Sequence, residues 1–165
     1  TKGFFGNQKV DFIKTCSNAS KIVIYINLMT SKNRIFYNFK NEQVPSNKFL
    51  LIFDAKSFQI ERDLNLPDFK IESLSANKTA IFVLSYDKKS IIIFNWNLEQ
   101  IKTIEVDSSV RFPDCPSILT SDEYLILPHY EKTISSSWCK FFKIYSRFDE
   151  TTGELNFVDI LEYKS

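Results

Sequence analysis

The sequence predicts an all-β protein made of repeated units of four short antiparallel strands. Apolar runs of four or five residues recur along the chain, and short polar breaks separate them. The run LLIFD at 50–54 also aligns without gaps on IIIFN at 91–95, a shift of 41 residues. Self-similarity at a period of this size is typical of an array of stacked repeats.

The middle copy shows the pattern most plainly. Residues 69–74 predict a first strand, which a turn at 75–77 joins to the apolar run AIFVL at 80–84. A polar break follows, and the run IIIF at 91–94 predicts the third strand. Residues 100–106 mostly alternate apolar and polar side chains, which is typical of a half-exposed outer strand.

The first and third copies follow the same order. Their predicted strands are residues 10–13, 22–26, 50–54 and 58–64 in the first copy, and residues 117–119, 124–127, 141–145 and 155–160 in the third. A turn precedes the second strand of each, at 16–18 and at 120–122. We therefore expect repeat units at about 10–66, 67–110 and 115–162, within residues 1–165 as a single domain or a fragment of one.

A unit of four strands in about 40 to 50 residues has the size of a propeller blade. We expect about three four-stranded antiparallel blades. Closed propellers have about 4 to 8 blades, so the remaining blades of a longer parent chain are expected partners. Thr1 in place of an initial Met agrees with a chain that is processed or cut from something longer. The alternative is an antiparallel β-sandwich or barrel, because short strands and polar turns predict these as well.

The turns and strand ends resemble those of the WD-repeat and related β-propeller families. In these families Ser-x-Asp/Asn stands between the first and second strands, and an aromatic-Asp pair ends the third. The matching positions in this chain are Ser75 with Asn77, Phe53 with Asp54, and less closely Phe94 with Asn95. The Gly-His and Trp-Asp signatures of a WD repeat proper are absent. The resemblance covers about residues 11–160 and implies a degenerate, WD-repeat-like β-propeller.

Composition argues against several classes of partner. The chain has 21 Lys and Arg residues against 20 Asp and Glu residues, a net charge of +1, so its overall field does not attract nucleic acid. The longest apolar run, IIIF at 91–94, is far shorter than the roughly 20 residues of a membrane helix. We therefore expect neither a membrane span nor nucleic-acid binding.

The three cysteines, Cys16, Cys115 and Cys139, are odd in number and lack CxxC spacing. This pattern predicts neither a disulfide framework nor a zinc site. We expect buried free thiols in a reducing compartment, which is the cytoplasm.

No pattern of catalytic or cofactor-binding residues is found. The one histidine, His129, has no Gly-x-Ser-x-Gly motif to accompany it, and three glycines do not supply a phosphate-binding loop. Carboxylates are scattered, without the Asp-x-Asp-x-Asp spacing of an oxygen-ligand metal loop. We predict no catalytic residue, no metal and no cofactor.

Two segments match the acceptor sequence for N-glycosylation, at Asn18-Ala19-Ser20 and at Asn77-Lys78-Thr79. In a chain rich in Asn, Ser and Thr such matches arise by chance. The sequence does not decide whether they are used.

The insertion at residues 28–48, between the second and third strands of the first copy, is the candidate binding segment. Four basic residues and one acidic residue give it a charge of +3. Its bases and aromatics interleave at Arg34, Phe36, Tyr37, Phe39 and Lys40, a pattern that fits a protein-binding surface or the stacking of single-stranded bases. The alternative is a long hairpin packed on its own blade, with the aromatic faces turned inward.

The sequence therefore predicts a non-catalytic protein–protein interaction scaffold of β-propeller type. The alternative is part of a hydrolase-like propeller enzyme whose active site is completed outside this chain. An RNA-binding propeller is a third option, which the near-neutral charge disfavours. Propeller folds carry binding modules and enzymes alike, so the step from fold to function is an analogy.

Overall fold

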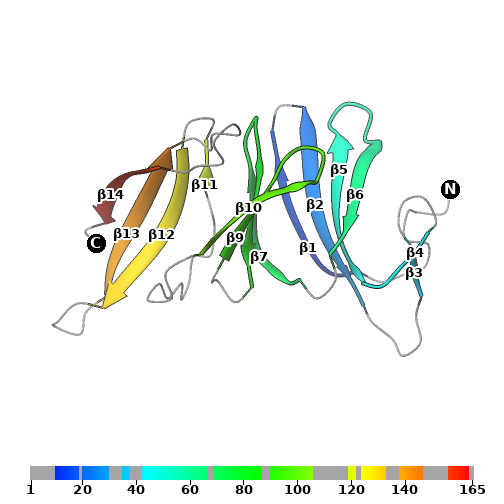
Figure 1. The fold of residues 1–165 in the computed structure, drawn as a ribbon, viewed down its shortest axis with the longest axis horizontal. Coiled ribbons are helices and arrows are strands. Elements are labelled where there is room, and N and C mark those ends of the chain that lie inside the picture. Colours follow the sequence, from blue (N-terminus) through cyan, green and yellow to red (C-terminus); the bar gives the residue numbers. More distant parts are fainter. Residues whose placement is uncertain are drawn as a thin grey trace. The chain divides into compact units, whose positions relative to one another are not determined.

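All regular elements in the described part of the chain are β-strands (Figure 1). The computed structural model describes residues 10–18, 20–29, 35–37, 42–66, 69–86, 90–105, 119–121, 124–132, 138–146 and 156–163. The chain divides into two compact units, Thr1–Lys70 and Ile71–Ser165. The prediction of an all-β fold is confirmed.

The first unit contains a four-stranded antiparallel sheet in the order β1-β2-β5-β6. These strands are β1 (Val10–Ser17), β2 (Lys21–Leu28), β5 (Lys48–Asp54) and β6 (Ile60–Asn65). Between β2 and β5, the short strands β3 (Phe36–Tyr37) and β4 (Gln43–Val44) pair with each other as a separate two-stranded sheet.

The second unit contains two further antiparallel sheets of four strands each. The second sheet holds β7 (Ile71–Ala76), β8 (Ile81–Ser85), β9 (Ser90–Phe94) and β10 (Gln100–Glu105), and the third holds β11 (Leu119–Thr120), β12 (Tyr124–Lys132), β13 (Trp138–Ser146) and β14 (Phe157–Tyr163). Three separate sheets, each an antiparallel meander, are the arrangement expected of propeller blades. The prediction of about three four-stranded blades is confirmed, whereas the extent of the domain stays a prediction.

The central strands of the first sheet are buried on both faces. On one face Val23 pairs with Ile52 and Tyr25 with Leu50, and none of these four side chains is more than 1% exposed. The alternate residues, which point to the other face, are also apolar; Ile26, Phe49 and Leu51 are buried, and Ile24 and Phe53 are partly buried. The unbroken apolar runs in β2 and β5 therefore follow from a sheet that has no solvent face at its centre.

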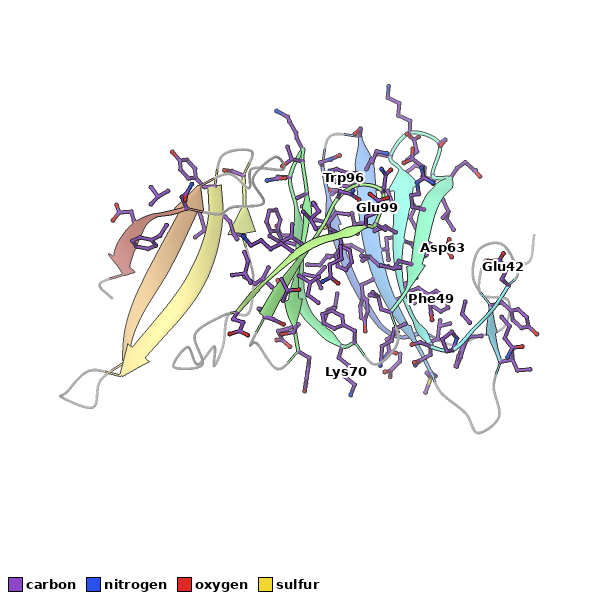
Figure 2. The ribbon with its side chains drawn as sticks, in the orientation of Figure 1. Glu42, Phe49, Asp63, Lys70, Trp96 and Glu99 are labelled. Carbon is purple, nitrogen blue, oxygen red and sulfur yellow. The ribbon has the colours of Figure 1, made fainter. Side chains whose placement is uncertain are left out.

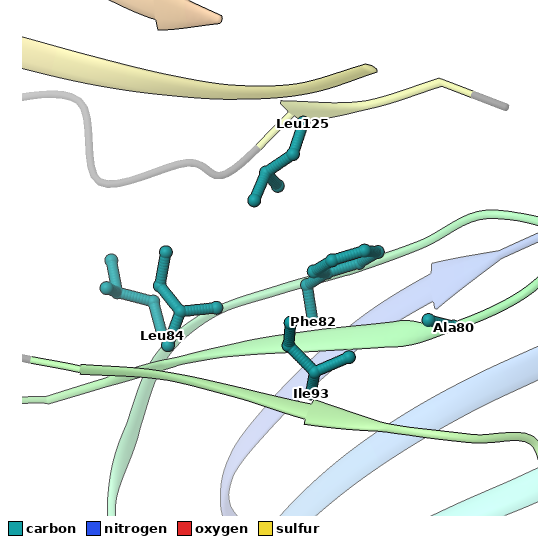
Figure 3. Close-up of a cluster of buried hydrophobic side chains, with 6 residues drawn as sticks. Ala80, Phe82, Leu84, Ile93 and Leu125 are labelled. Carbon is teal, nitrogen blue, oxygen red and sulfur yellow. The ribbon is translucent and has the colours of Figure 1, made fainter. Parts of the chain in front are cut away.

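In the second unit, the second and third sheets share an apolar cluster (Figure 3). Leu125 of β12 points toward Phe82 and Leu84 of β8 and Ile93 of β9. Leu125 is 2% exposed, and burial of such a side chain contributes about 1.5 to 3 kcal/mol. This contact holds the third sheet on one face of the second.

The turn between the first and second strands of each sheet is closed by one polar side chain. Asn18 Oδ1 accepts hydrogen bonds from the backbone N–H groups of Ser20 and Lys21, at 2.9 and 2.8 Å. Asn77 Oδ1 accepts from Thr79 and Ala80 in the same way, at 3.0 and 2.9 Å. In the third sheet, Ser121 Oγ accepts from the N–H of Tyr124 at 3.0 Å. Each of the three repeats therefore has a side-chain hydrogen-bond acceptor at this turn.

Asn77 also joins two of these turns to each other. Its side chain is 6% exposed, and its Nδ2 donates to the carbonyl oxygen of Ser121 at 3.1 Å. Nδ2 is the atom to which a glycan would be attached, and the burial of this side chain leaves no room for a glycan at Asn77 in this arrangement. The two acceptor sequences thus coincide with turns because a turn-closing Asn is followed two residues later by Ser or Thr, whose hydroxyl also donates to Asn Oδ1.

Several predicted boundaries differ from the structure by a few residues. Cys16 and Ser17 belong to β1, and Ser75 and Ala76 belong to β7, because the turn begins only at the Asn side chain that closes it. In the third sheet, pairing of β12 with β13 continues to Lys132 and Trp138, through polar residues that the apolar pattern did not include. Backbone hydrogen bonds extend a hairpin regardless of side-chain polarity.

Replacement of Asn77 by Ala is expected to lower the free energy of unfolding by about 2 to 3 kcal/mol, because buried N–H groups and the Ser121 carbonyl lose their partner. Asn18→Ala, in the matching but less buried turn, is expected to cost about 1 kcal/mol. Urea unfolding of both variants measures the difference. An Asn18→Ala cost equal to or larger than that of Asn77→Ala would contradict the importance of the bond to Ser121.

Candidate functional site

The insertion between β2 and β5 starts from a rigid stem. The backbone N–H of Leu28 donates to the carbonyl oxygen of Asn47 at 2.9 Å. The Asn47 side chain also binds the end of β2. Its Nδ2 donates to the Leu28 carbonyl oxygen at 2.6 Å and to Asn27 Oδ1 at 2.8 Å. The two ends of the insertion are thus tied together at the last residue of β2.

A second set of bonds ties the same stem to β6. Ser46 is 7% exposed, and its Oγ donates to the carbonyl oxygen of Leu66 at 3.2 Å. Asn65 Nδ2 donates to the carbonyl oxygens of Ser46 and Lys48, at 2.9 and 3.0 Å. Short polar side chains therefore fix the backbone at the two ends of the insertion.

Phe36 and Tyr37, which the sequence analysis named as candidate binding residues, point in opposite directions. Both lie in β3, where Phe36 pairs with Val44 and Tyr37 with Gln43. Phe36 is 9% exposed, whereas Tyr37 is 48% exposed. Successive side chains of a strand alternate between its two faces, so one ring is directed into the core and the other to solvent. The other three candidates, Arg34, Phe39 and Lys40, lie outside the described residues.

Met29, Ile35 and Tyr37 are the exposed large apolar residues among the described residues of the insertion, and we call this set the hairpin patch. Their exposed fractions are 46%, 51% and 48%. Met29 directly follows Leu28, Ile35 and Tyr37 flank Phe36 in the sequence, and Leu28 and Phe36 belong to one buried cluster. Glu42, which directly precedes β4, is also exposed (Figure 2).

Sequence reasoning did not identify Met29 and Ile35. The run IFY at 35–37 does not reveal which of its members turns inward, and that choice follows from the pairing of β3 with β4. Large apolar side chains exposed elsewhere in the described chain are Phe58, Tyr86, Tyr124, Phe157 and Val158. The hairpin patch is notable among them because its members all belong to one insertion whose ends are joined by hydrogen bonds.

The turn between β5 and β6 presents a second exposed aromatic residue, Phe58. Asp54 Oδ1 accepts hydrogen bonds from the N–H of Ser57 at 2.7 Å, from its hydroxyl at 2.8 Å, and from the N–H of Lys56 at 3.1 Å. The backbone at Phe58 has φ of 54°, in the left-handed region, and its side chain is 67% exposed. This conformation is unfavourable for a residue other than Gly or Asn.

The second sheet has a similar turn, but the left-handed residue in it is buried. Asn95 Oδ1 accepts from the N–H groups of Asn97 and Glu99, at 2.9 and 3.0 Å. Leu98, with φ of 63°, is the left-handed residue there, and it is 6% exposed. Burial of Leu98 offsets its backbone strain, whereas the exposed Phe58 gains little from burial.

Two ionisable groups have shifted pKa values. The N–H of Ser57, followed by its hydroxyl, holds the pKa of Asp54 below the ordinary value of 3.8 because these donors stabilise the carboxylate. Burial raises the pKa of Cys16 to about 12, so this free thiol stays protonated at neutral pH. Cys139 lies in β13, and Cys115 lies outside the described residues.

The described residues offer no metal site and no membrane helix. No group there of three or more His, Cys, Asp or Glu residues could hold a metal ion. His129 lies within β12, where its Cα partner is Phe141. No helix in the described chain is both long and apolar enough to cross a membrane.

Comparisons with known proteins show what this fold is similar to. The chain matches no protein-family model, and no curated protein sequence matches it. Among solved structures it is similar to Kluyveromyces lactis Hsv2, with 11% identity and a TM-score of 0.51 over 95% of this chain and 38% of Hsv2. Kluyveromyces lactis Hsv2 with its loop 6CD replaced by a Gly-Ser linker gives 11% identity and a TM-score of 0.52, over 95% of this chain and 40% of that one.

A third similar structure is the β-propeller domain of the Trilobed protease from Pyrococcus furiosus, at 12% identity and a TM-score of 0.41, over 92% of this chain and 57% of that one. The likeness to Hsv2, a β-propeller protein, shows that this chain has a β-propeller-like fold. The chain spans about two fifths of the length of the Hsv2 structures that it matches.

Phe58→Gly is expected to raise the free energy of unfolding by on the order of 1 kcal/mol, because it removes the left-handed strain at an exposed position. Leu98→Gly is expected to lower it by about 2 kcal/mol, because the lost burial outweighs the same relief. Thermal or urea unfolding of the pair checks both signs. Destabilisation by Phe58→Gly would show that the ring is held by contacts of its own.

The pKa of Asp54 is expected to lie below 3.8 in the folded protein and to rise toward that value in Ser57→Ala, which removes the hydroxyl donor. Lys56→Gln should change the pKa less, because it keeps the backbone N–H of Lys56 and removes only the charge of its side chain, which is the smallest of the contributing causes. Since the folded pKa is the lower one, the ionised carboxylate stabilises the fold above about pH 4, and this contribution is lost as the pH falls through the folded value. NMR titration of the carboxyl carbon measures this pKa in the unmodified protein and in both variants. A larger shift in Lys56→Gln than in Ser57→Ala would refute this assignment.

Proposed function

We propose that this chain is a non-catalytic protein-interaction module of β-propeller type, and that the hairpin patch is its contact surface. The supporting observation is the combination of exposed Met29, Ile35 and Tyr37 with a stem fixed by Asn47, Ser46 and Asn65. A rigid stem reduces the ordering entropy that binding costs, and exposed apolar side chains provide the area that a partner can cover.

The charge of the insertion suggests the chemistry of its partner. With four basic residues and one acidic residue, the insertion complements an acidic protein surface that also offers apolar side chains. Tyr and Arg dominate the energetics of protein interfaces, so Tyr37 and Arg34 are the proposed anchors, with Phe39 and Lys40 as neighbours. Phe36 serves the surface indirectly, because it anchors the hairpin in the core.

The proposal includes three finer statements about the protein. It is a degenerate WD-repeat-like propeller, which the turn residues Ser75 and Asn77 and the pair Phe53-Asp54 support. It acts in the cytoplasm, as the odd number and the wide spacing of the three cysteines suggest. It works together with further blades, as its likeness to less than half of a longer propeller suggests.

The experiment compares two exposed tyrosines of the same protein. A photo-crosslinking amino acid is placed at Tyr37 or at Tyr86, which is 62% exposed and lies at the end of β8. A protein captured through position 37 is then purified and its affinity measured by calorimetry. Tyr37→Ala should weaken binding about tenfold, and Tyr86→Ala less than twofold, because a central aromatic anchor is worth more than 1 kcal/mol.

The proposed charge complementarity adds a second readout. The dissociation constant should rise with salt concentration, because the attraction between basic insertion and acidic partner is screened. The proposal fails if Tyr37→Ala and Tyr86→Ala bind the captured protein equally well.

A further inference from the structure

The inner side of the β3–β4 hairpin covers one face of the first sheet. Phe36 of β3 is buried together with Ile26 and Leu28 of β2 and Phe49 and Leu51 of β5. Val44, the cross-strand partner of Phe36, packs against the same cluster. The contact lies within the first unit and joins the insertion to the sheet from which it emerges.

Phe36 and Val44 contribute to the cover on this face. Leu28, Phe49 and Leu51 are 0–1% exposed and belong to the same cluster as Phe36, whereas Ile24 and Phe53 are only partly buried. Ile24 and Leu51 are register partners, and the residues on this face alternate with those on the opposite one. The hairpin therefore supplies part of the cover of this face.

In a propeller, a sheet face of this composition packs against a neighbouring sheet. We propose that the β3–β4 hairpin is an intramolecular cap, which occupies the position of such a neighbour and prevents a further sheet from packing on this face. The terminal repeats of stacked arrays need a cover of this kind to remain soluble. Further blades would then add elsewhere and not on this face.

A hairpin this small can cover the sheet face because its stem is bound to the same sheet. The two strands contribute only two residues each, too few for independent stability. The bonds of Asn47, Ser46 and Asn65 keep the hairpin beside its face, so docking of Phe36 is an intramolecular event at high effective concentration. The hairpin thus has a capping side at Phe36 and Val44, and an outer side at Tyr37. This assignment holds whether or not a partner binds the outer side.

The test removes the cap from the full chain. Residues 30–44 are replaced by a short Gly-Ser linker, which the close approach of Leu28 and Asn47 permits. Sedimentation velocity over a range of concentrations should show that this variant associates more strongly than the unmodified chain, and a hydrophobic dye should bind it, because Leu28, Phe49 and Leu51 become uncovered. Tyr37→Ala is the matched control, and it should sediment as the unmodified chain does.

Addition of the missing segment in trans identifies the occupant of the face. A synthetic peptide of residues 30–46 should reduce both the association and the dye binding of the shortened chain, and the same peptide with Phe36→Ala should not. If the shortened chain does not fold, as judged by circular dichroism, Phe36→Ala in the full chain should gain association and dye binding, and Phe36→Leu should gain less. The proposal is overturned if a folded shortened chain, or the Phe36→Ala chain in its place, behaves as the unmodified chain does. Loss of partner binding in Tyr37→Ala is a separate result that leaves the cap unaffected.

Discussion

The two-sided apolar character of the central strands is the constraint on which the architecture depends. In β2 and β5 both faces carry almost fully buried apolar residues, such as Val23 and Tyr25 on one face and Leu28 and Phe49 on the other. A sheet of this kind is unstable alone, because each face must find a cover. Leu125 of the third sheet covers one face of the second, and the β3–β4 hairpin covers one face of the first. Packing against another sheet and packing against the hairpin cap are thus two ways in which an apolar sheet face is covered.

The polar side chains at the turns then determine where the chain reverses direction within each sheet. Asn18, Asn77 and Ser121 each place an oxygen acceptor at the same point of the repeat, so that the second strand returns beside the first. The register that follows decides which residues meet across the strands, and thus which face each side chain joins. Asn77 has the additional role of linking two turns through the Ser121 carbonyl, which couples turn geometry to the packing of the second and third sheets.

Much of the fold could be predicted from local sequence, because the two central strands of each of the first two sheets are short apolar runs bounded by polar breaks. The predicted run 22–26 lies within β2, and 50–54 lies within β5. Prediction failed where side-chain polarity carries no signal: β12 extends through His129 and Glu131 because of its pairing with β13. The insertion was recognised by its length and charge, but the opposite orientations of Phe36 and Tyr37 depend on a two-residue pairing that no periodicity reveals.

The two residues of β3 have different roles: Phe36 packs in the core, and Tyr37 forms part of the exposed surface. Phe36 is held by the sheet, and its burial fixes where β3 lies; the side chain of Tyr37 is then directed to solvent by strand geometry alone. An insertion without the buried ring would have to order itself on binding, at a large entropic cost. Because Phe36 and the Asn47 stem order the hairpin in advance, a partner that contacts Tyr37 meets a surface already in place. The same contact that covers the sheet thus makes the outer side suitable for recognition.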